Sequence, residues 1–240
     1  MLESKLIRLV GMFVLLFTVQ CNAGAVPENQ QGPALNLSIR YYEKALTSEG
    51  VLRESHFEES MLRRPGHVWV MRVLPKSSMA ETEGHEHHAH EVGHEHKHFD
   101  PVLLPRHVSL ENDQLKLAYV DRSNKEIINI VATEYENANF DGSWVNAYFL
   151  VDPRLVVKLP VSSRVSPVTG ARWYEQEKNG VFQRILWDEK DLVPLEVETG
   201  RTDGTILRKV SVKKLKLSSE AAPWATVNGY TQKEYSDFLD

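Results

Sequence analysis

The chain has 240 residues, 42% hydrophobic and 25% charged, a length that suits one large domain or two small ones. Its formal net charge is −5 at pH 7, which disfavours nucleic acids and anionic membrane surfaces as partners. It contains one cysteine, Cys21.

Residues 1–25 have the pattern of a secretory signal peptide. Lys5 and Arg8 precede an apolar run, Leu9–Val19, which is shorter than the roughly 20 residues that span a bilayer. The small residues 23–25 then form a cleavage site. We expect export to the periplasm with residues 1–25 removed, and an uncleaved anchor is the alternative. Cleavage removes the cysteine, excluding disulfides, and leaves 28 − 2 = 26 basic and 33 − 1 = 32 acidic residues, a net charge of −6.

A lipid anchor through Cys21 is a further alternative for the localisation. Bacterial lipoproteins carry their acylated cysteine just after the apolar run, as Cys21 is placed here. Gln20 is bulky where such a site has a small residue, which favours the cleaved form. Membrane contact is expected only if Cys21 is lipidated.

The first predicted elements follow a short leader. Residues 26–34 are rich in Pro, Gln and Gly and predict a flexible leader, and Leu35–Leu46 fits a helical stripe and a strand equally well. Gly50–Leu62 predicts a strand, and Pro65-Gly66 predicts a turn. His67–Leu74 is a short apolar run typical of a strand buried on both faces.

The middle of the chain predicts a hairpin, a strand and a helix. Val108–Leu110 and Leu115–Val120 flank an Asn112-Asp113 turn, and Glu126–Val131 adds a strand. Ser143–Val151 predicts a helix capped by Ser143, with a buried strand as the alternative. Its apolar face would carry Trp144, Ala147, Tyr148 and Val151. Leu155–Val161 is expected to be extended.

The pattern from residue 171 to 217 predicts consecutive antiparallel strands. The strands are Ala171–Glu177, Val181–Trp187, Leu192–Thr199 and Thr205–Leu217. Asn179-Gly180 between the first two is typical of a tight turn with positive φ. Along the last strand, Val210 and Val212 differ in parity from Leu215 and Leu217, which predicts a bulge or sharp twist near Lys213-Lys214. A sheet covered on both faces is the alternative.

Thr231 and Glu234 form a capping box that predicts a final helix, Gln232–Leu239, with Tyr235, Phe238 and Leu239 on the sheet. Several strands about ten residues apart with few helices predict a mainly β (α+β) fold. We expect a single curved antiparallel sheet, or unclosed β-barrel, with helices on its concave side and a C-terminal helix. The predicted domain covers residues 35–240, with an insertion at 76–99.

The insertion contains the strongest chemical pattern of the chain. Seven histidines crowd into it: His85, His87, His88, His90, His94, His96 and His98. Because it has almost no apolar residues, we expect it to be disordered without metal. Such tracts bind divalent transition metals, here Zn, Cu or Ni, and occupancy should fall below about pH 6. Metal capacity without a physiological role is the alternative.

Outside the tract, His56, His67 and His107 are candidate ligands for an ion at its base, although a lone strand histidine is more often structural. No catalytic signature is present, and acidic pairs such as Glu196 and Glu198 are typical of a solvated strand face. We therefore expect no enzyme and no cofactor other than the metal. Trp69, Trp173 and Trp187 either line an apolar cavity in the curved sheet or belong to its ordinary core.

Short motifs resemble one known family. They are Arg64-Pro65-Gly66 followed by Trp69, Leu186-Trp187-Asp188, Val193-Pro194-Leu195-Glu196 and Asp203-Gly204. Together they resemble the LolA/RseB-like periplasmic proteins, loosely from Ile39 to Tyr230. The resemblance implies an unclosed β-barrel with helices as a lid, which binds acyl chains or lipoproteins in its concave face. The chain departs from that pattern by its histidine insertion.

The sequence thus favours a non-enzymatic periplasmic protein that binds an apolar ligand or a lipoprotein segment and carries a metal-binding histidine loop. The alternative is a periplasmic transition-metal buffer or metallochaperone, in which the sheet only displays the tract.

Overall fold

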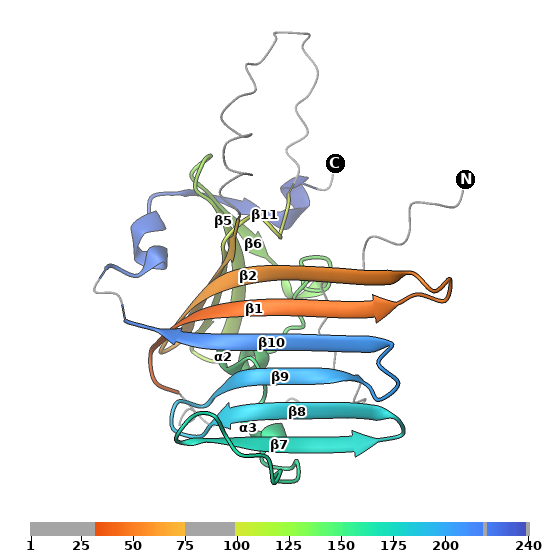
Figure 1. Ribbon diagram of the computed structural model, residues 1–240. Helices are drawn as coiled ribbons and strands as arrows, with labels where there is room; N and C mark the ends of the chain where they lie inside the picture. The colour runs from red at the N-terminus through yellow and green to blue at the C-terminus, as the bar shows by residue number, and fades with distance from the viewer. Residues whose placement is uncertain (1–31, 75–98, 218–219, 239–240) are drawn as a thin grey trace.

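The computed structural model describes residues 32–74, 99–217 and 220–238. Their strands form one 11-stranded sheet in the order β11-β6-β5-β4-β3-β2-β1-β10-β9-β8-β7 (Figure 1). All neighbours pair antiparallel except β11 and β6, which are parallel. The fold is therefore mainly β with an unclosed sheet, as the sequence predicts.

The strands are β1 Leu35–Leu46, β2 Leu52–Arg64, β3 His67–Val73, β4 Arg106–Glu111, β5 Gln114–Asp121, β6 Glu126–Ile130, β7 Ala171–Lys178, β8 Val181–Asp188, β9 Val193–Arg201, β10 Ile206–Leu215 and β11 Thr231–Glu234. The helical segments are η1 Ala132–Glu134, α2 Trp144–Phe149, α3 Pro153–Val156, η2 Pro223–Val227 and η3 Tyr235–Phe238.

The meander β7–β10 confirms the predicted strands and their turns. Asn179 and Gly180 have φ of 53° and 74°, the positive values that a two-residue hairpin of this hand requires. The same chemistry closes the β4–β5 hairpin, where Asn112 and Asp113 have φ of 49° and 62°. The ambiguous first segment is a strand, because β1 pairs along its whole length with β2 and over most of it with β10.

The bulge predicted near Lys213-Lys214 is wrong. β10 pairs with β1 without a register shift from Ile206 to Leu215. Leu215 is 44% exposed, so it imposes no change of face. Lys214 keeps the parity of the buried Val210 and is accommodated because its Nζ lies 2.7 Å from Asp188 and 2.5 Å from Asp191.

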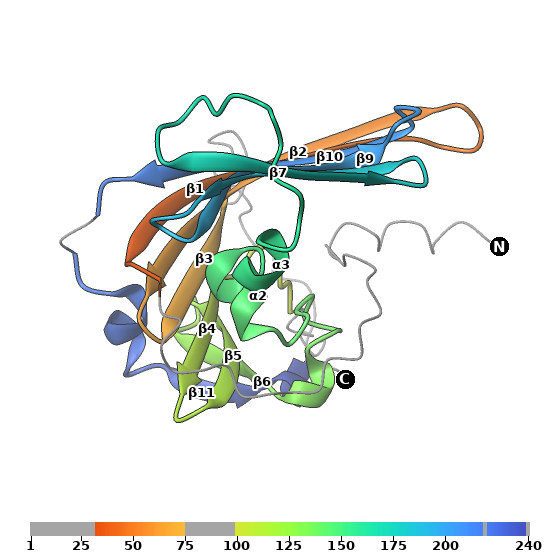
Figure 2. The same ribbon diagram turned by 90° about the horizontal axis from the view of Figure 1, so that it is seen from below.

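The connection from β6 to β7 crosses the concave side of the sheet and carries α2 and α3 (Figure 2). Ser143 caps α2 as predicted, its Oγ accepting from Asn146 N–H at 3.1 Å. The extended segment predicted over Leu155–Val161 is wrong in its first part, since Leu155 and Val156 belong to α3, whereas Val161 at its end forms an antiparallel bridge with Tyr174. Asp152 accepts from Arg154 N–H, and Pro153 suits the first helical position.

The predicted C-terminal helix is also wrong in its first half. Thr231–Glu234 forms β11, because β6 offers an open edge whose backbone groups a parallel strand can satisfy. Only Tyr235–Phe238 is helical, as the 3-10 segment η3. Tyr235 and Phe238 pack on the core as expected, while Leu239 lies outside the described residues.

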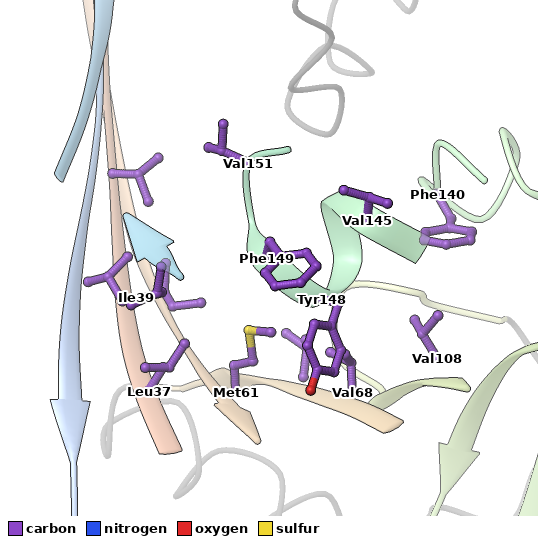
Figure 3. Packing of buried hydrophobic residues seen from close by; sticks show 14 of the residues in the cluster. Leu37, Ile39, Met61, Val68, Val108, Phe140, Val145, Tyr148, Phe149 and Val151 are labelled. Atoms are coloured by element: carbon purple, nitrogen blue, oxygen red, sulfur yellow. The ribbon is translucent and has the colours of Figure 1, made fainter. Parts of the chain in front are cut away.

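Side-chain alternation gives the sheet an inner face towards α2 and an outer face. The main core lies on the inner face and includes Leu37, Met61, Val68 and Val108 (Figure 3). A second cluster lies on the outer face, where Trp69 and Val120 meet Val227 of η2. The sheet is thus covered on opposite sides by two different segments of the chain.

Candidate functional site: the inner face and its lid

Helix α2 closes the apolar inner face. Val145, Tyr148 and Phe149 are buried against the strands, as Figure 3 shows. The Tyr148 hydroxyl donates to the carbonyl of Gly32 at 2.9 Å, which ties the helix to the start of β1. Leu150 ends the helix with φ of 67°, a left-handed conformation that is strained for leucine. Side-chain packing therefore holds a short helix that carries strain at its C-terminal end.

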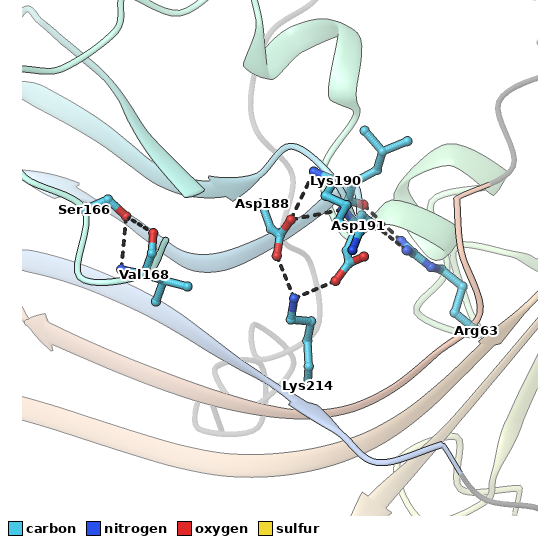
Figure 4. Close-up of polar contacts among 8 residues, drawn as sticks. Arg63, Ser166, Val168, Asp188, Lys190, Asp191 and Lys214 are labelled. Carbon is cyan, nitrogen blue, oxygen red and sulfur yellow. Dashed lines mark hydrogen bonds and ion pairs between the residues drawn. The ribbon is translucent and has the colours of Figure 1, made fainter. Parts of the chain in front are cut away.

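Arg63 is fully buried beneath this helix. Its Nε donates to the Pro33 carbonyl at 3.0 Å and its Nη1 to the Leu192 carbonyl at 2.9 Å, while Nη2 donates to the Asp191 carbonyl (Figure 4). Burial lowers its pKa to about 10, so the guanidinium stays charged at neutral pH. Arg63 thereby joins β2 to the β8–β9 turn, where Leu192 is held at φ of 49°.

Two other arginines lie on the inner face beside the apolar core. Arg72 is directly opposite Glu59 of β2, and Arg106 lies diagonally across from Arg72 on β4. The Arg72 guanidinium carbon is 3.6 Å from the centre of the Phe57 ring, which stacks on Tyr41 at 4.4 Å. Arg106 Nε is buried and has no hydrogen-bond acceptor among the described residues.

The charges of this arginine pair are incompletely balanced. Burial lowers the pKa of Arg72 and nearby Glu59 partly offsets that effect. Burial also raises the pKa of Tyr41, and Glu59 raises it further. Within the described ranges, neither guanidinium has a carboxylate at ion-pair distance of 4.0 Å or less. Around Arg72 and Arg106 the inner face therefore holds two half-buried cations and one neighbouring carboxylate, that of Glu59, which gives this place a local excess of positive charge.

The outer face brings together two of the histidines considered as ligands. His67 Nδ1 and His107 Nε2 are 3.2 Å apart, so one ring donates an N–H to the other. Both rings stack on the indole of Trp224, at centroid distances of 4.8 and 5.4 Å. Burial lowers the pKa of both, to about 4 for His107, where charge on His67 adds to the effect. Both are therefore neutral at pH 7.

This pair supplies at most two metal ligands, whereas zinc sites use three or four protein ligands. His56 lies apart from it, exposed on β2 opposite Tyr42. No group of three or more His, Cys, Asp or Glu side chains suited to a metal gathers in residues 32–74, 99–217 and 220–238. The seven histidines of the predicted metal tract, residues 85–98, lie outside the described residues.

The three tryptophans considered as cavity lining are each nearly fully buried but lie in different places. Trp187 belongs to the main core and Trp69 to the outer cluster. Trp173 belongs to neither cluster and is covered by Arg164, whose guanidinium carbon is 4.0 Å from the indole centre. Their burial is that of core residues.

Sequence reasoning did not single out Arg63, Arg72 or Arg106. Arginine is mostly exposed, so its type gave no reason to place it inside. A weak pattern did exist, since Arg63 shares the parity of Met61 on β2, and Met61 is apolar. None of the described helices is long and apolar enough to cross a bilayer.

No family model matches the chain, and no curated protein is similar to it. Solved structures give partial similarities. They include a putative outer membrane lipoprotein-sorting protein domain from Vibrio parahaemolyticus (TM-score 0.27, 10% identity, 80% of this chain and 89% of that one) and a LolA superfamily protein from Nitrosomonas europaea (TM-score 0.30, 10% identity, 80% and 89%).

A third similar structure is that of PNGF-II (TM-score 0.35, 12% identity). The similarity covers 84% of this chain but only 32% of the PNGF-II chain. The class that the sequence motifs resemble is thus represented among the similar structures. At such low TM-scores these similarities carry no argument about ligands or activity. The function has to be inferred from the residues of this chain.

Proposed function

We propose that the chain is a non-enzymatic, exported binding protein that takes an apolar ligand or partner segment on the inner face of its sheet, beneath α2. The observation that carries this proposal is the apolar surface under the helix, made by Leu37, Met61, Val68 and Val108. Strands β1 to β4 supply it, so it stays in place when the helix moves.

Helix α2 is suited to act as a lid. Its six residues are far below the length of roughly 12 to 15 at which an isolated helix becomes even marginally stable, so contacts with the sheet must sustain it. Lifting it would relieve the strain at Leu150 and break the Tyr148–Gly32 hydrogen bond. A ligand that replaces the apolar contacts of α2 would therefore compete with the helix for the same face.

Loosening the lid tests this proposal. Tyr148→Phe removes the hydrogen bond to Gly32 and keeps the ring, so it should strengthen binding of the apolar probe N-phenyl-1-naphthylamine several-fold in a fluorescence titration. Tyr135→Phe is the matched control, because Tyr135 also donates to a backbone carbonyl, that of Leu115 at 3.2 Å, but lies outside α2. Equal probe binding by both variants and the wild type would contradict the lid.

We further propose that the histidine tract binds Zn, Cu or Ni, on the strength of its composition. Deleting residues 83–98 should abolish metal binding in calorimetric titrations and leave the melting temperature without metal nearly unchanged. Native mass spectrometry of untagged protein distinguishes the roles. A copurifying lipid-sized ligand supports the binding protein, whereas several bound metals and no such ligand favour the metal buffer or metallochaperone.

A further inference from the structure

We propose that Arg72 and Arg106 bind the anionic head group, a carboxylate or phosphate, of an amphiphile whose apolar part lies on the inner face of the sheet. This inference rests on the proposed function and adds the chemical class of the ligand.

Arg72 and Arg106 differ from other cations of the chain in their partners. Arg63 has three carbonyl acceptors, and Lys209 and Lys214 each contact two carboxylates. Arg72 and Arg106 are half-buried and form no ion pair among the described residues, and the buried Nε of Arg106 has no acceptor. A buried donor without a partner is unfavourable, so an oxygen-rich anion at this place would be strongly bound.

The arginine pair also lies next to the apolar surface of the inner face. Strand pairing places Arg106 in one cross-strand row with Val70, Met61 and Leu37, all buried on the inner face. A head group at Arg106 would therefore lie beside an apolar row long enough for several methylene groups, and the row continues past Arg106 through Tyr119 and Ile128.

The two arginines are placed so that both guanidinium groups can reach one anion. Diagonal neighbours on adjacent antiparallel strands are separated by about 7 to 8 Å at the backbone, a span that two long side chains can close around one carboxylate or phosphate. The planar fork of arginine matches the oxygens of either group. The Phe57 ring holds the Arg72 guanidinium in place by a cation–π contact, which uses none of its N–H groups as a hydrogen-bond donor to an oxygen. Glu59 offsets one of the two charges, so one anionic group restores neutrality.

Titration of the full chain with three ligands tests the inference: dodecyl phosphate, dodecanol and inorganic phosphate, each below its aggregation concentration. Arg72→Gln and Arg106→Gln should each weaken dodecyl phosphate binding about tenfold or more and change dodecanol binding less than twofold. Arg106→Lys keeps the charge but loses the planar fork of the guanidinium, so its affinity for dodecyl phosphate should lie between those of the wild type and Arg106→Gln. Arg40→Gln, an exposed arginine on β1, is the matched control and should change neither affinity.

The outcomes separate the two proposals. Equal wild-type affinity for dodecyl phosphate and dodecanol, or no loss in either glutamine variant, would overturn the head-group assignment and leave the binding function standing. If inorganic phosphate competes at the same concentration as dodecyl phosphate, the apolar chain adds nothing to binding, and this would overturn the proposal that the ligand is an amphiphile. No binding of either dodecyl compound would overturn the proposed function as well.

Discussion

The two faces of this sheet are covered by different means. On the inner face α2 packs an apolar layer over Arg63, whose charge is satisfied by backbone carbonyls and does not titrate near neutral pH. On the outer face the η2 segment covers the hydrogen-bonded pair His67 and His107 with Trp224. The Arg63 contacts of the inner face therefore do not change with pH near neutrality, whereas the outer face depends on two imidazoles that must remain neutral.

Replacing Arg63 on the inner face should have the largest effect on the free energy of unfolding. Arg63→Leu removes the donors to the carbonyls of Pro33, Leu192 and Asp191. We expect a loss of about 3 to 5 kcal/mol in the free energy of unfolding, measured by urea denaturation, because three hydrogen bonds from one charged group are lost together.

The adjacent arginine provides the control. Arg64 is only partly buried and donates to the Leu35 carbonyl and to Asn36 Oδ1. Arg64→Leu should cost about 1 kcal/mol, since water can replace it at these groups. Equal losses in the two variants would contradict the special role of Arg63.

Acid should loosen the outer face. His107 has a pKa of about 4 when folded against an ordinary value of 6.5, so the unfolded chain binds the proton first as pH falls. The contribution of neutral His107 to the free energy of unfolding is complete above about pH 6.5 and is lost progressively down to about pH 4, below which it stays constant. The total loss is up to about 3 kcal/mol. Unfolding curves between pH 7.5 and 4 would measure it.

Two histidine variants isolate this effect. His107→Gln should flatten the stability profile between pH 6.5 and 4, whereas His56→Gln, on an exposed part of β2, should leave its slope unchanged. A profile of wild-type slope in the His107 variant would show that other groups carry the acid sensitivity.

The indole that covers the pair has a smaller role. Trp224→Ala removes the ring stacked on both imidazoles, at an expected cost of about 2 kcal/mol, because Trp224 is only partly buried. It should also raise the pKa of His107 towards its usual range by admitting water, which histidine proton resonances in an NMR titration would detect. An unchanged His107 pKa would mean that the strands alone keep water out.

The elements that the sequence predicted correctly depend on local chemistry. Asn179-Gly180 and Asn112-Asp113 set the hairpins through their backbone preferences, and Ser143 set the start of α2 through its hydroxyl. Such choices involve residues close in the chain, so a single sequence contains them.

The incorrect predictions concern segments whose structure depends on residues that are distant in the chain. The Thr231–Glu234 segment has a capping box, yet the open edge of β6 makes it a strand. Lys214 points towards Asp188 and Asp191 of the β8–β9 turn, which removes the need for a bulge. The arginine pair was missed for the same reason, since Arg72 and Arg106 are 34 positions apart and meet only through strand pairing.

The smallest effect is expected at a site remote from both covered faces. Asn179→Ala places a residue with a Cβ and no compensating side-chain amide at φ of 53° in the β7–β8 turn, which should cost about 1 kcal/mol. Asn179→Gly, which accepts this conformation, should be nearly neutral. Because the turn touches neither Arg63 nor the histidine pair, the loss should be the same at pH 7.5 and pH 5. A loss of stability that grows in acid would mean that the meander β7–β10 and the outer face unfold as one unit. The segments that cover the two faces would then be coupled through the sheet.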